Sequence, residues 1–332
     1  MRLLDQITQH ATPLIVIGES GSDLTRPLRL PGAADFAAQI RACPLRYVLS
    51  DQLAAVCAEL ALAGGDRLSS CLDLIHLPAE TFWIEWSESA RARAAAGQHP
   101  CSGAGAPLRV GALVRSSLDG RRGVLRTFWE DEQGVPCLAP LETHLDLACR
   151  WPPAASLQSL LNGGLARLSA TDDPGLEELL ECMRFRYDPQ WAAYYRDAHL
   201  AAEAQVQLLY ASLATVARDM PLVLAFALLL GARNALATRR VDREQLNRRR
   251  RLRNQRPLLE HLEVSCRLDV GPCAATGHGP GRRAPRLHYV RGHLLRRANE
   301  IYWRKTHMRG RAVLGRVHSR TVRLSFGAAP AP

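Results

Sequence analysis

Lysine is almost absent from this chain of 332 residues. It occurs once, at Lys305, so nearly all of the positive charge is carried by arginine. A GC-rich genome, which favours arginine codons, accounts for most of this bias. The chemical consequence holds regardless of its origin, because a guanidinium group grips phosphate through two hydrogen bonds and stacks on bases as an ammonium group cannot.

Long apolar runs and paired cysteines are also missing. The longest apolar run, PLVLAFALLLGA at 221–232, is shorter than the roughly 20 residues that cross a bilayer, so we expect a buried helix that Pro221 opens. The first residues, MRLLDQITQH, lack the basic and then apolar order of a secretion signal. None of the nine cysteines stands in a Cys-x-x-Cys pair, which favours reduced thiols. We therefore expect a cytoplasmic protein without a membrane partner.

Three catalytic or ligand-binding signatures are incomplete. The segment IVIGESGS at 15–22 starts like a nucleophile elbow, but Ser22 stands where the second glycine is required, and no Gly-Lys-Ser/Thr of a phosphate loop follows. The candidate metal ligands lack the short paired spacing of a zinc module, and the surrounding arginines would repel a divalent cation. These candidates are Cys266, Cys273, His278, His288, His293, His307 and His318. We expect neither a metal nor a cofactor.

What the chain does have is a strong separation of charge. Between Arg233 and Arg323 there are 24 basic and 6 acidic residues, whereas the first 232 residues hold 19 basic and 26 acidic ones. Such asymmetry is typical of a protein whose basic part meets a polyanion, most often nucleic acid. The densest run is Arg248–Arg251, followed by Arg253 and Arg256. We interpret it as a surface for phosphate rather than a merely solvated charge block.

The order of sequence patterns predicts an α+β fold. Helical patterns occur at 50–65, 172–186, 189–219 and 221–232, while 239–257 is expected to begin as a helix and to end as an exposed arginine-rich connector. Strand patterns occur at 81–86, 108–116, 123–130, 134–147, 258–270 and 319–326, with a hairpin at Asp119-Gly120. We predict a mixed body with an antiparallel sheet at 1–150, a helical region at 151–256 and a small basic β-rich domain at 257–332.

The segment HYVRGHLLRRANEIYWRKTHMRG at 288–310 permits three interpretations. Its aromatic and histidine side chains could pack locally in a small sheet, or its arginines and aromatics could contact nucleic acid. It could also cleave RNA without a metal, with His293 and His307 as base and acid and Arg291 holding the phosphate. The predicted nucleic-acid contacts are Arg248, Arg249, Arg250, Arg251, Arg253, Arg291, Arg296, Arg297, Tyr302, Trp303, Arg304, Lys305 and Arg309.

Several segments together resemble a known group of proteins. They are LPAETFWIEW, VLRTFWEDEQG, LVLAFALLLGA, VDREQLNRRRR and HYVRGHLL with EIYWRKTHMRG and RTVRLSF. In this order they resemble phage and mobile-element proteins that include a type V-A anti-CRISPR family, which blocks production of the Cas12-type effector nuclease. The best matches are Leu77-Pro78, Arg243-Glu244 and Arg291-Gly292-His293.

The resemblance implies a regulatory protein that is encoded by a phage or plasmid and acts inside the bacterial host. It would recognise the nascent peptide of a defence protein on the translating ribosome and cause loss of the mRNA, with RNA as a partner. No catalytic residue follows from the resemblance. We therefore expect a binding protein that suppresses host defence, with the histidine-dependent ribonuclease and a protein–protein inhibitor with a basic docking face as the alternatives.

Overall fold

A computed structural model describes most of the chain and contains one large sheet. The described residues are 2–9, 33–62, 68–89, 108–130, 134–152, 160, 163–167, 174–188, 202–232, 235–267, 286–290, 293–297, 300–304, 307–309 and 311–316. The sheet has eight strands in the order β6-β5-β4-β3-β2-β1-β8-β7. They are β1 (Leu45–Leu49), β2 (Thr81–Ser87), β3 (Arg109–Ser116), β4 (Arg122–Glu130), β5 (Pro136–Asp146), β6 (Met183–Tyr187), β7 (Leu236–Val241) and β8 (His261–Cys266).

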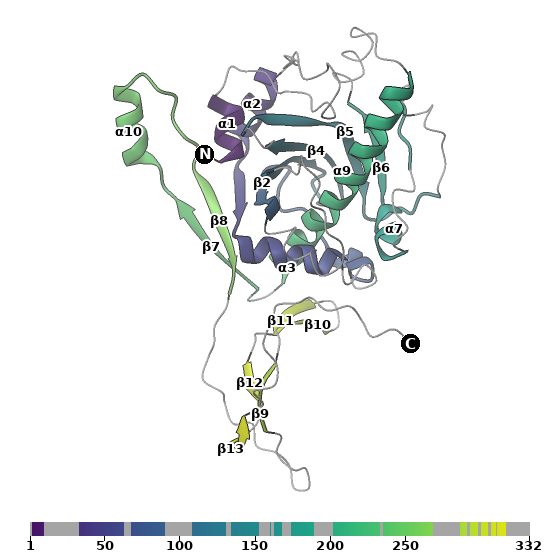
Figure 1. The fold of residues 1–332 in the computed structure, drawn as a ribbon, viewed down its shortest axis with the longest axis vertical. Helices are drawn as coiled ribbons and strands as arrows, with labels where there is room; N and C mark the ends of the chain where they lie inside the picture. Colours follow the sequence, from purple (N-terminus) through teal and green to yellow (C-terminus); the bar gives the residue numbers. More distant parts are fainter. Residues whose placement is uncertain are drawn as a thin grey trace.

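Helices cover both faces of this sheet (Figure 1). The covering helices are α1 (Leu3–Gln9), α2 (Ala33–Ala42), α3 (Asp51–Leu62), α7 (Pro174–Leu180) and α9 (Ala202–Gly231), and a short 3-10 turn spans Leu72–Leu74. A further helix, α10 (Glu244–Leu252), stands away from the sheet. Strand β1 is parallel to both of its neighbours, β2 and β8, and the other neighbouring strands are antiparallel. The α+β prediction is therefore confirmed.

Alternation along β2 divides the core between the two faces of the sheet. Phe82 makes an edge-on contact with Tyr47, which in turn contacts Phe226 of α9 at 5.1 Å between ring centroids. The next residue, Trp83, points the other way and contacts Phe128, which meets Phe36 of α2 at 5.5 Å. Strand β2 is therefore buried on both of its faces, as a nearly continuous hydrophobic strand is expected to be.

The predicted hairpin lies between β3 and β4. Gly120 has φ +66°, and a Cβ there would come within 2.8 Å of the Leu77 carbonyl oxygen, so glycine is required for both reasons. The Asp119 carboxylate accepts hydrogen bonds from the Ser117 hydroxyl and from the Arg121 backbone N–H at 3.0 Å. These bonds close the turn and set the register of β3 against β4.

Three of the expected elements differ from the structure. Pro221 does not open a helix, because α9 runs through it as one helix of 30 residues whose C-terminal half is buried. The helix predicted at 172–186 ends at Leu180, and 183–187 form β6, whose buried and half-buried residues alternate. Residues 239–241, expected to be helical, belong to strand β7, and the helix starts only at Glu244.

The basic C-terminal part contributes to the main sheet. Strand β8, predicted to belong to a separate domain, lies between β1 and β7, so the predicted boundary at 256–257 falls within the connection from β7 to β8. Further along, β10 (His293–Arg297) pairs with β11 (Glu300–Arg304), and β9 (Arg286–Val290) pairs with β12 (His307–Arg309) and, in parallel, with β13 (Arg311–Arg316). The predicted strand at 319–326 lies outside the described residues. Across the described ranges, no helix combines the length and apolar character needed to cross a bilayer.

Candidate nucleic-acid interface

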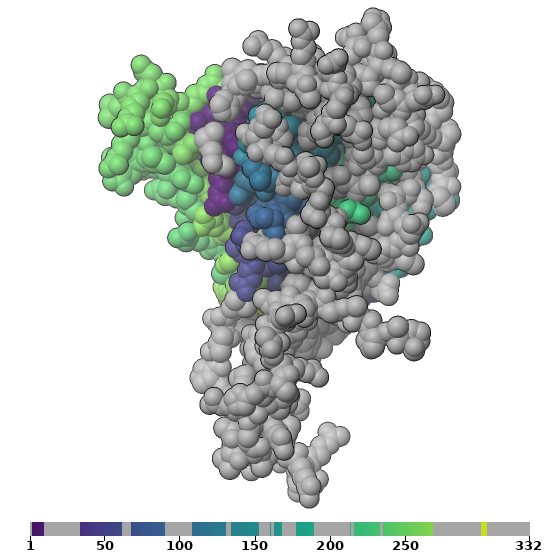
Figure 2. Space-filling view, viewed as in Figure 1, coloured from purple at the N-terminus to yellow at the C-terminus, as the bar shows by residue number. Residues whose placement is uncertain are grey.

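The arginine run predicted from the sequence forms helix α10, which is displayed at the end of an edge hairpin. The helix connects β7 and β8 and stands away from the sheet at the left of Figure 1. In the space-filling view it forms the green projection at the upper left (Figure 2). Its outward surface also exposes Leu246 and Leu252, which are 41% and 87% exposed. The helix therefore offers arginine and leucine side chains to a partner.

The arginines of this segment divide into structural and available groups. Arg250 is half-buried and donates to the Arg256 carbonyl oxygen at 2.9 Å and to the Gln9 side-chain oxygen at 2.7 Å. Arg248 is exposed and forms an ion pair with Glu244 at 2.7 Å one turn earlier. Such an exposed pair is weak and is readily exchanged for a phosphate.

Three exposed arginines have no side-chain partner among the described residues. They are Arg249, Arg251 and Arg253. Guanidinium groups without a carboxylate partner keep all their donors for an incoming anion, and each can contact two phosphate oxygens. Arg248, Arg249 and Arg251 lie on α10, and Arg253 directly follows its last residue, so the structure brings these four predicted contacts into one short segment.

Local sequence explains why α10 begins and ends where it does. The Asp242 carboxylate accepts the backbone N–H of Glu244 at 2.7 Å, which satisfies one of the unpaired donors of the first turn. Arginines occupy the last turn, where positive charge is favourable at the carboxyl end of the helix dipole. Beyond Leu252 the chain turns at Asn254, which adopts φ +54°, and the helix cannot continue.

Helix α1 braces this unit against the sheet. The Asp5 carboxylate accepts the backbone N–H of Leu259 at 3.0 Å, and Gln9 accepts the hydrogen bond from Arg250. Arg2 forms an ion pair with Glu263 of β8 at 3.0 Å. Burial raises the pKa of Asp5, although the hydrogen bond from Leu259 opposes that shift. The orientation of α10 thus depends on a helix that lies more than 200 residues earlier in the chain.

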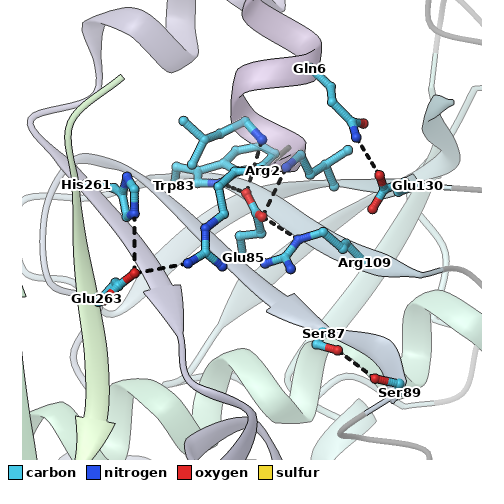
Figure 3. Close-up of polar contacts among 12 residues, drawn as sticks. Arg2, Gln6, Trp83, Glu85, Ser87, Ser89, Arg109, Glu130, His261 and Glu263 are labelled. Carbon is cyan, nitrogen blue, oxygen red and sulfur yellow. Dashed lines mark hydrogen bonds and ion pairs between the residues drawn. The ribbon is translucent and has the colours of Figure 1, made fainter. Parts of the chain in front are cut away.

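A buried carboxylate holds α1 in turn, as Figure 3 shows. Glu85 of β2 accepts the backbone N–H groups of Leu3 and Leu4, each at 3.0 Å, and the Trp83 indole N–H at 3.3 Å. The Arg109 guanidinium donates to the same carboxylate at 2.6 Å. The side chain is fully buried, so these donors replace its water shell, and breaking the set would leave a charge without compensation.

The predicted histidine pair lies in two different strand pairs. His293 is in β10 opposite Arg304, and His307 is in β12 opposite Val290. The side chains of both histidines, and all of Arg291 and Lys305, lie outside what the structure describes. No contact described in the structure joins the two histidines, and the ribonuclease reading stays a prediction.

The remaining predicted contacts lie on the same C-terminal strands. Arg296 and Arg297 are in β10, Arg304 is in β11 and Arg309 is in β12, with only their backbone described. Tyr302 is half-buried and donates to the Glu300 carboxylate. Trp303 is also half-buried and packs against the hydrophobic core next to buried Ile301. Trp303 thus contacts the core, and the contacts predicted between this segment and nucleic acid stay a prediction.

Sequence reasoning missed the polar residues that anchor the site. Asp5, Glu85 and Glu263 are single carboxylates in otherwise ordinary segments, and their partners are far away in the chain. The only signal was Glu85 itself, a charged residue inside the aromatic strand pattern TFWIEW. Within the described ranges, no three His, Cys, Asp or Glu side chains are placed to hold a metal ion.

Comparison of the chain with protein-family models, with curated proteins and with solved structures found no match. The fold and the site define an α+β protein that displays an arginine-rich helix on the edge hairpin of a mixed sheet. Function is therefore inferred from the chemistry of that helix.

Proposed function

We propose that this protein binds RNA through α10, with the phosphate backbone held by Arg248, Arg249, Arg251 and Arg253. The observation that carries the proposal is the set of three exposed arginines without a described side-chain partner, on and directly after a helix that α1 fixes to the sheet. The backbone that carries these arginines is already held in place by α1 and Asn247, so binding has to order only their side chains. Guanidinium groups suit an anion with regularly spaced phosphates.

The C-terminal strands extend the same chemistry. Their arginines belong to the stretch between Arg233 and Arg323, which contains 24 basic residues and 6 acidic ones. A single-stranded RNA that crosses α10 and continues over these strands would meet positive charge along its path. In keeping with the resemblance to anti-CRISPR proteins, we further propose that the bound RNA is the message of a defence protein, alone or in a translating complex with its nascent peptide.

Fluorescence anisotropy with a labelled single-stranded RNA over a series of salt concentrations tests the binding. The informative variant is Arg249→Gln/Arg251→Gln/Arg253→Gln, which removes three contacts and keeps helix-compatible side chains. Because binding to single strands loses affinity with salt at a log–log slope of about 0.7 per contacted phosphate, the variant's slope should fall by about 2. Its affinity at low salt should fall by about tenfold or more.

The matched control removes three arginines elsewhere on the body. Arg115, Arg122 and Arg150 are exposed, and the ion pair between Arg150 and Glu181 is a weak one at 3.8 Å. The triple glutamine variant at these positions has the same change in net charge. If the control and the α10 variant lose affinity equally, binding depends on net charge alone and the proposal is wrong.

The same samples separate binding from cleavage. RNA recovered from the wild-type protein with a chelator present is examined on a denaturing gel. Intact RNA supports a binding protein. Cleavage that disappears in both His293→Ala and His307→Ala, with binding retained, would instead establish the alternative ribonuclease.

A further inference from the structure

A second group of cations lies at the opposite end of the sheet from α10. Residues His144, Arg184 and Arg186 of β5 and β6, together with Arg126 of β4, form what we call the β5–β6 cation cluster. Glu142 is directly opposite both Arg126 and Arg186, and His144 is directly opposite Arg184. Residues opposite each other in neighbouring strands point to the same face, so all of these side chains share one face of the sheet.

Two carboxylates neutralise part of this cluster. Glu142 accepts hydrogen bonds from Arg126 and Arg186, each at 3.0 Å, and His144 Nε2 lies 3.0 Å from one of its oxygens. Asp188 accepts a bond from Arg126 at 2.8 Å. Burial by itself would raise the pKa of Glu142, but these partners together lower it to about 2. Both oxygens of Glu142 are therefore fully used by Arg126, Arg186 and His144.

Arg184 is left without a carboxylate. Its guanidinium group stacks over the Trp151 ring at 4.3 Å, and among the described residues it makes no ion pair. The side chain is half-buried, and its Nε–H is buried without an acceptor in the described part of the chain. The Nε–H of Arg186 is in the same situation. Burying a cation and its donors without an acceptor is unfavourable, and native structures rarely leave such donors unpaired.

The balance of charge points the same way. Four guanidinium groups lie on this part of the face, from Arg122, Arg126, Arg184 and Arg186, and only three carboxylates, from Glu142, Asp146 and Asp188, are there to balance them. Alternate residues of a strand lie about 7 Å apart, a spacing that an anion with several oxygen acceptors can bridge. Guanidinium groups bind such oxyanions through paired hydrogen bonds.

We propose that Arg184 and Arg186, beside His144, form a binding site for a phosphate oxyanion, supplied either as the free ion or as the terminal group of a small phosphate ester. The Arg184 guanidinium, held by Trp151, is the primary ligand, and Arg186 adds the donor that Glu142 does not use. The site is independent of RNA binding by α10, because β6 and β7 are the two opposite edges of the sheet.

Titration with inorganic phosphate, followed by calorimetry and by the arginine Nε–H signals in a ¹H–¹⁵N NMR spectrum, tests the site. Chloride keeps the ionic strength constant throughout. The expected result is saturable binding that shifts the Nε–H signals of Arg184 and Arg186. Arg184→Gln should weaken the binding by about tenfold or more, since it removes a charge-assisted pair of hydrogen bonds.

The matched control is Arg150→Gln, which removes one exposed charge whose described side-chain contacts are with Glu181 and the Cys149 carbonyl oxygen and not with the four residues of the cluster. Phosphate affinity should stay within about twofold of wild type in this variant, because an exposed charge acts only weakly at a distance. Equal weakening in Arg150→Gln and Arg184→Gln would overturn the proposal. If Arg184→Gln does not fold, the wild-type spectrum decides, since unshifted Arg184 and Arg186 signals at saturating phosphate would also overturn it.

Two further titrations identify the source of the phosphate and test whether this site is separate from α10. Adenosine monophosphate binding more tightly than inorganic phosphate supports the ester, and the reverse order supports the free ion. The α10 triple glutamine variant should bind phosphate as wild type does, even if RNA binding by α10 proves wrong. Phosphate binding that is lost in the α10 variant would show that the cluster is not a site of its own.

Discussion

Asn247 holds the backbone of Leu258 through both ends of its side-chain amide. Its Nδ2 group donates to the Leu258 carbonyl oxygen at 2.9 Å, and its Oδ1 accepts the Leu258 N–H at 2.7 Å. The asparagine is buried on the inner side of α10, so it ties the helix to the segment that leads into β8. The amide thus pairs with the Leu258 backbone through one donated and one accepted hydrogen bond, as a neighbouring strand would. This pairing fixes which side of α10 faces outward.

Replacing Asn247 should therefore weaken RNA binding although no arginine is changed. Asn247→Ala leaves a backbone N–H and a backbone carbonyl of Leu258 without partners, at a cost of about 1–3 kcal/mol. Urea denaturation measures the stability of the variant, and fluorescence anisotropy measures its RNA affinity. Asn247→Asp keeps only the hydrogen-bond acceptor, so its stability and RNA affinity should lie between those of the wild type and those of Asn247→Ala. Wild-type RNA affinity in a folded Asn247→Ala protein would show that the orientation of α10 is irrelevant.

Glu85→Gln should strongly destabilise the protein. The amide keeps the shape of the side chain, but it cannot serve two backbone N–H groups and leaves Arg109 without its ion-pair partner. Removing one member of a buried ion pair costs about 3–5 kcal/mol. Glu80→Gln at an exposed position of the neighbouring turn is the control and should have no measurable effect. Equal denaturation midpoints for the two variants would contradict the anchoring role of Glu85.

Stability should fall in acid because of Glu142. Its pKa is lowered from 4.5 to about 2 in the folded protein, so its contribution is complete above about pH 4.5 and is lost as the pH falls towards 2. The shift corresponds to about 3 kcal/mol. Urea denaturation at a series of acidic pH values should show this slope in the wild type and a shallower one in Glu142→Gln. If the stabilities of the wild type and Glu142→Gln change with pH in parallel, Glu142 is not the cause of the loss of stability in acid.

Gly111→Ala should destabilise the sheet through Trp83. A Cβ at Gly111 would lie 2.3 Å from Trp83 Cζ2, and the indole is fully buried, so it cannot move aside without disturbing the core. Overpacking of this kind costs about 1–3 kcal/mol. Gly231→Ala is the control, because among the described residues outside its own helix turn nothing lies within 4 Å of the added atom. Trp83→Leu combined with Gly111→Ala should be less destabilising than the sum of the single changes.

Strands β2 to β5 and β8 could be predicted from local patterns, but β1, β6, β7 and the order of the sheet could not. The strands at 81–86, 108–116, 123–130 and 134–147 correspond to β2 to β5, and each pairs with its neighbour in sequence. Strand β6 was missed although MRFRY alternates, because an acidic helix start just before it dominated the pattern. Pro221 suggested a helix start because its ring removes one hydrogen bond, yet burial around α9 offsets that loss.

The candidate site was partly visible in the same way. A run of arginines is a local signal, so Arg248–Arg251 could be predicted. The residues that orient the run could not, because Asp5, Gln9 and Glu85 act on partners that only the fold brings near. The β5–β6 cation cluster is likewise invisible in sequence, since it depends on the register of two strands about 40 residues apart.

The position of β8 has a consequence for how the protein reaches its folded state. Tyr47 of β1 pairs with Leu262 of β8, a partner that the ribosome adds 215 residues later. Until then, one edge of β1 stays open and α1 lacks its contacts with Leu259 and Arg250. Pairings between such distant segments form slowly. We therefore expect the sheet from β2 to β5 to form first during synthesis, and α10 to be locked in place in the last step of folding.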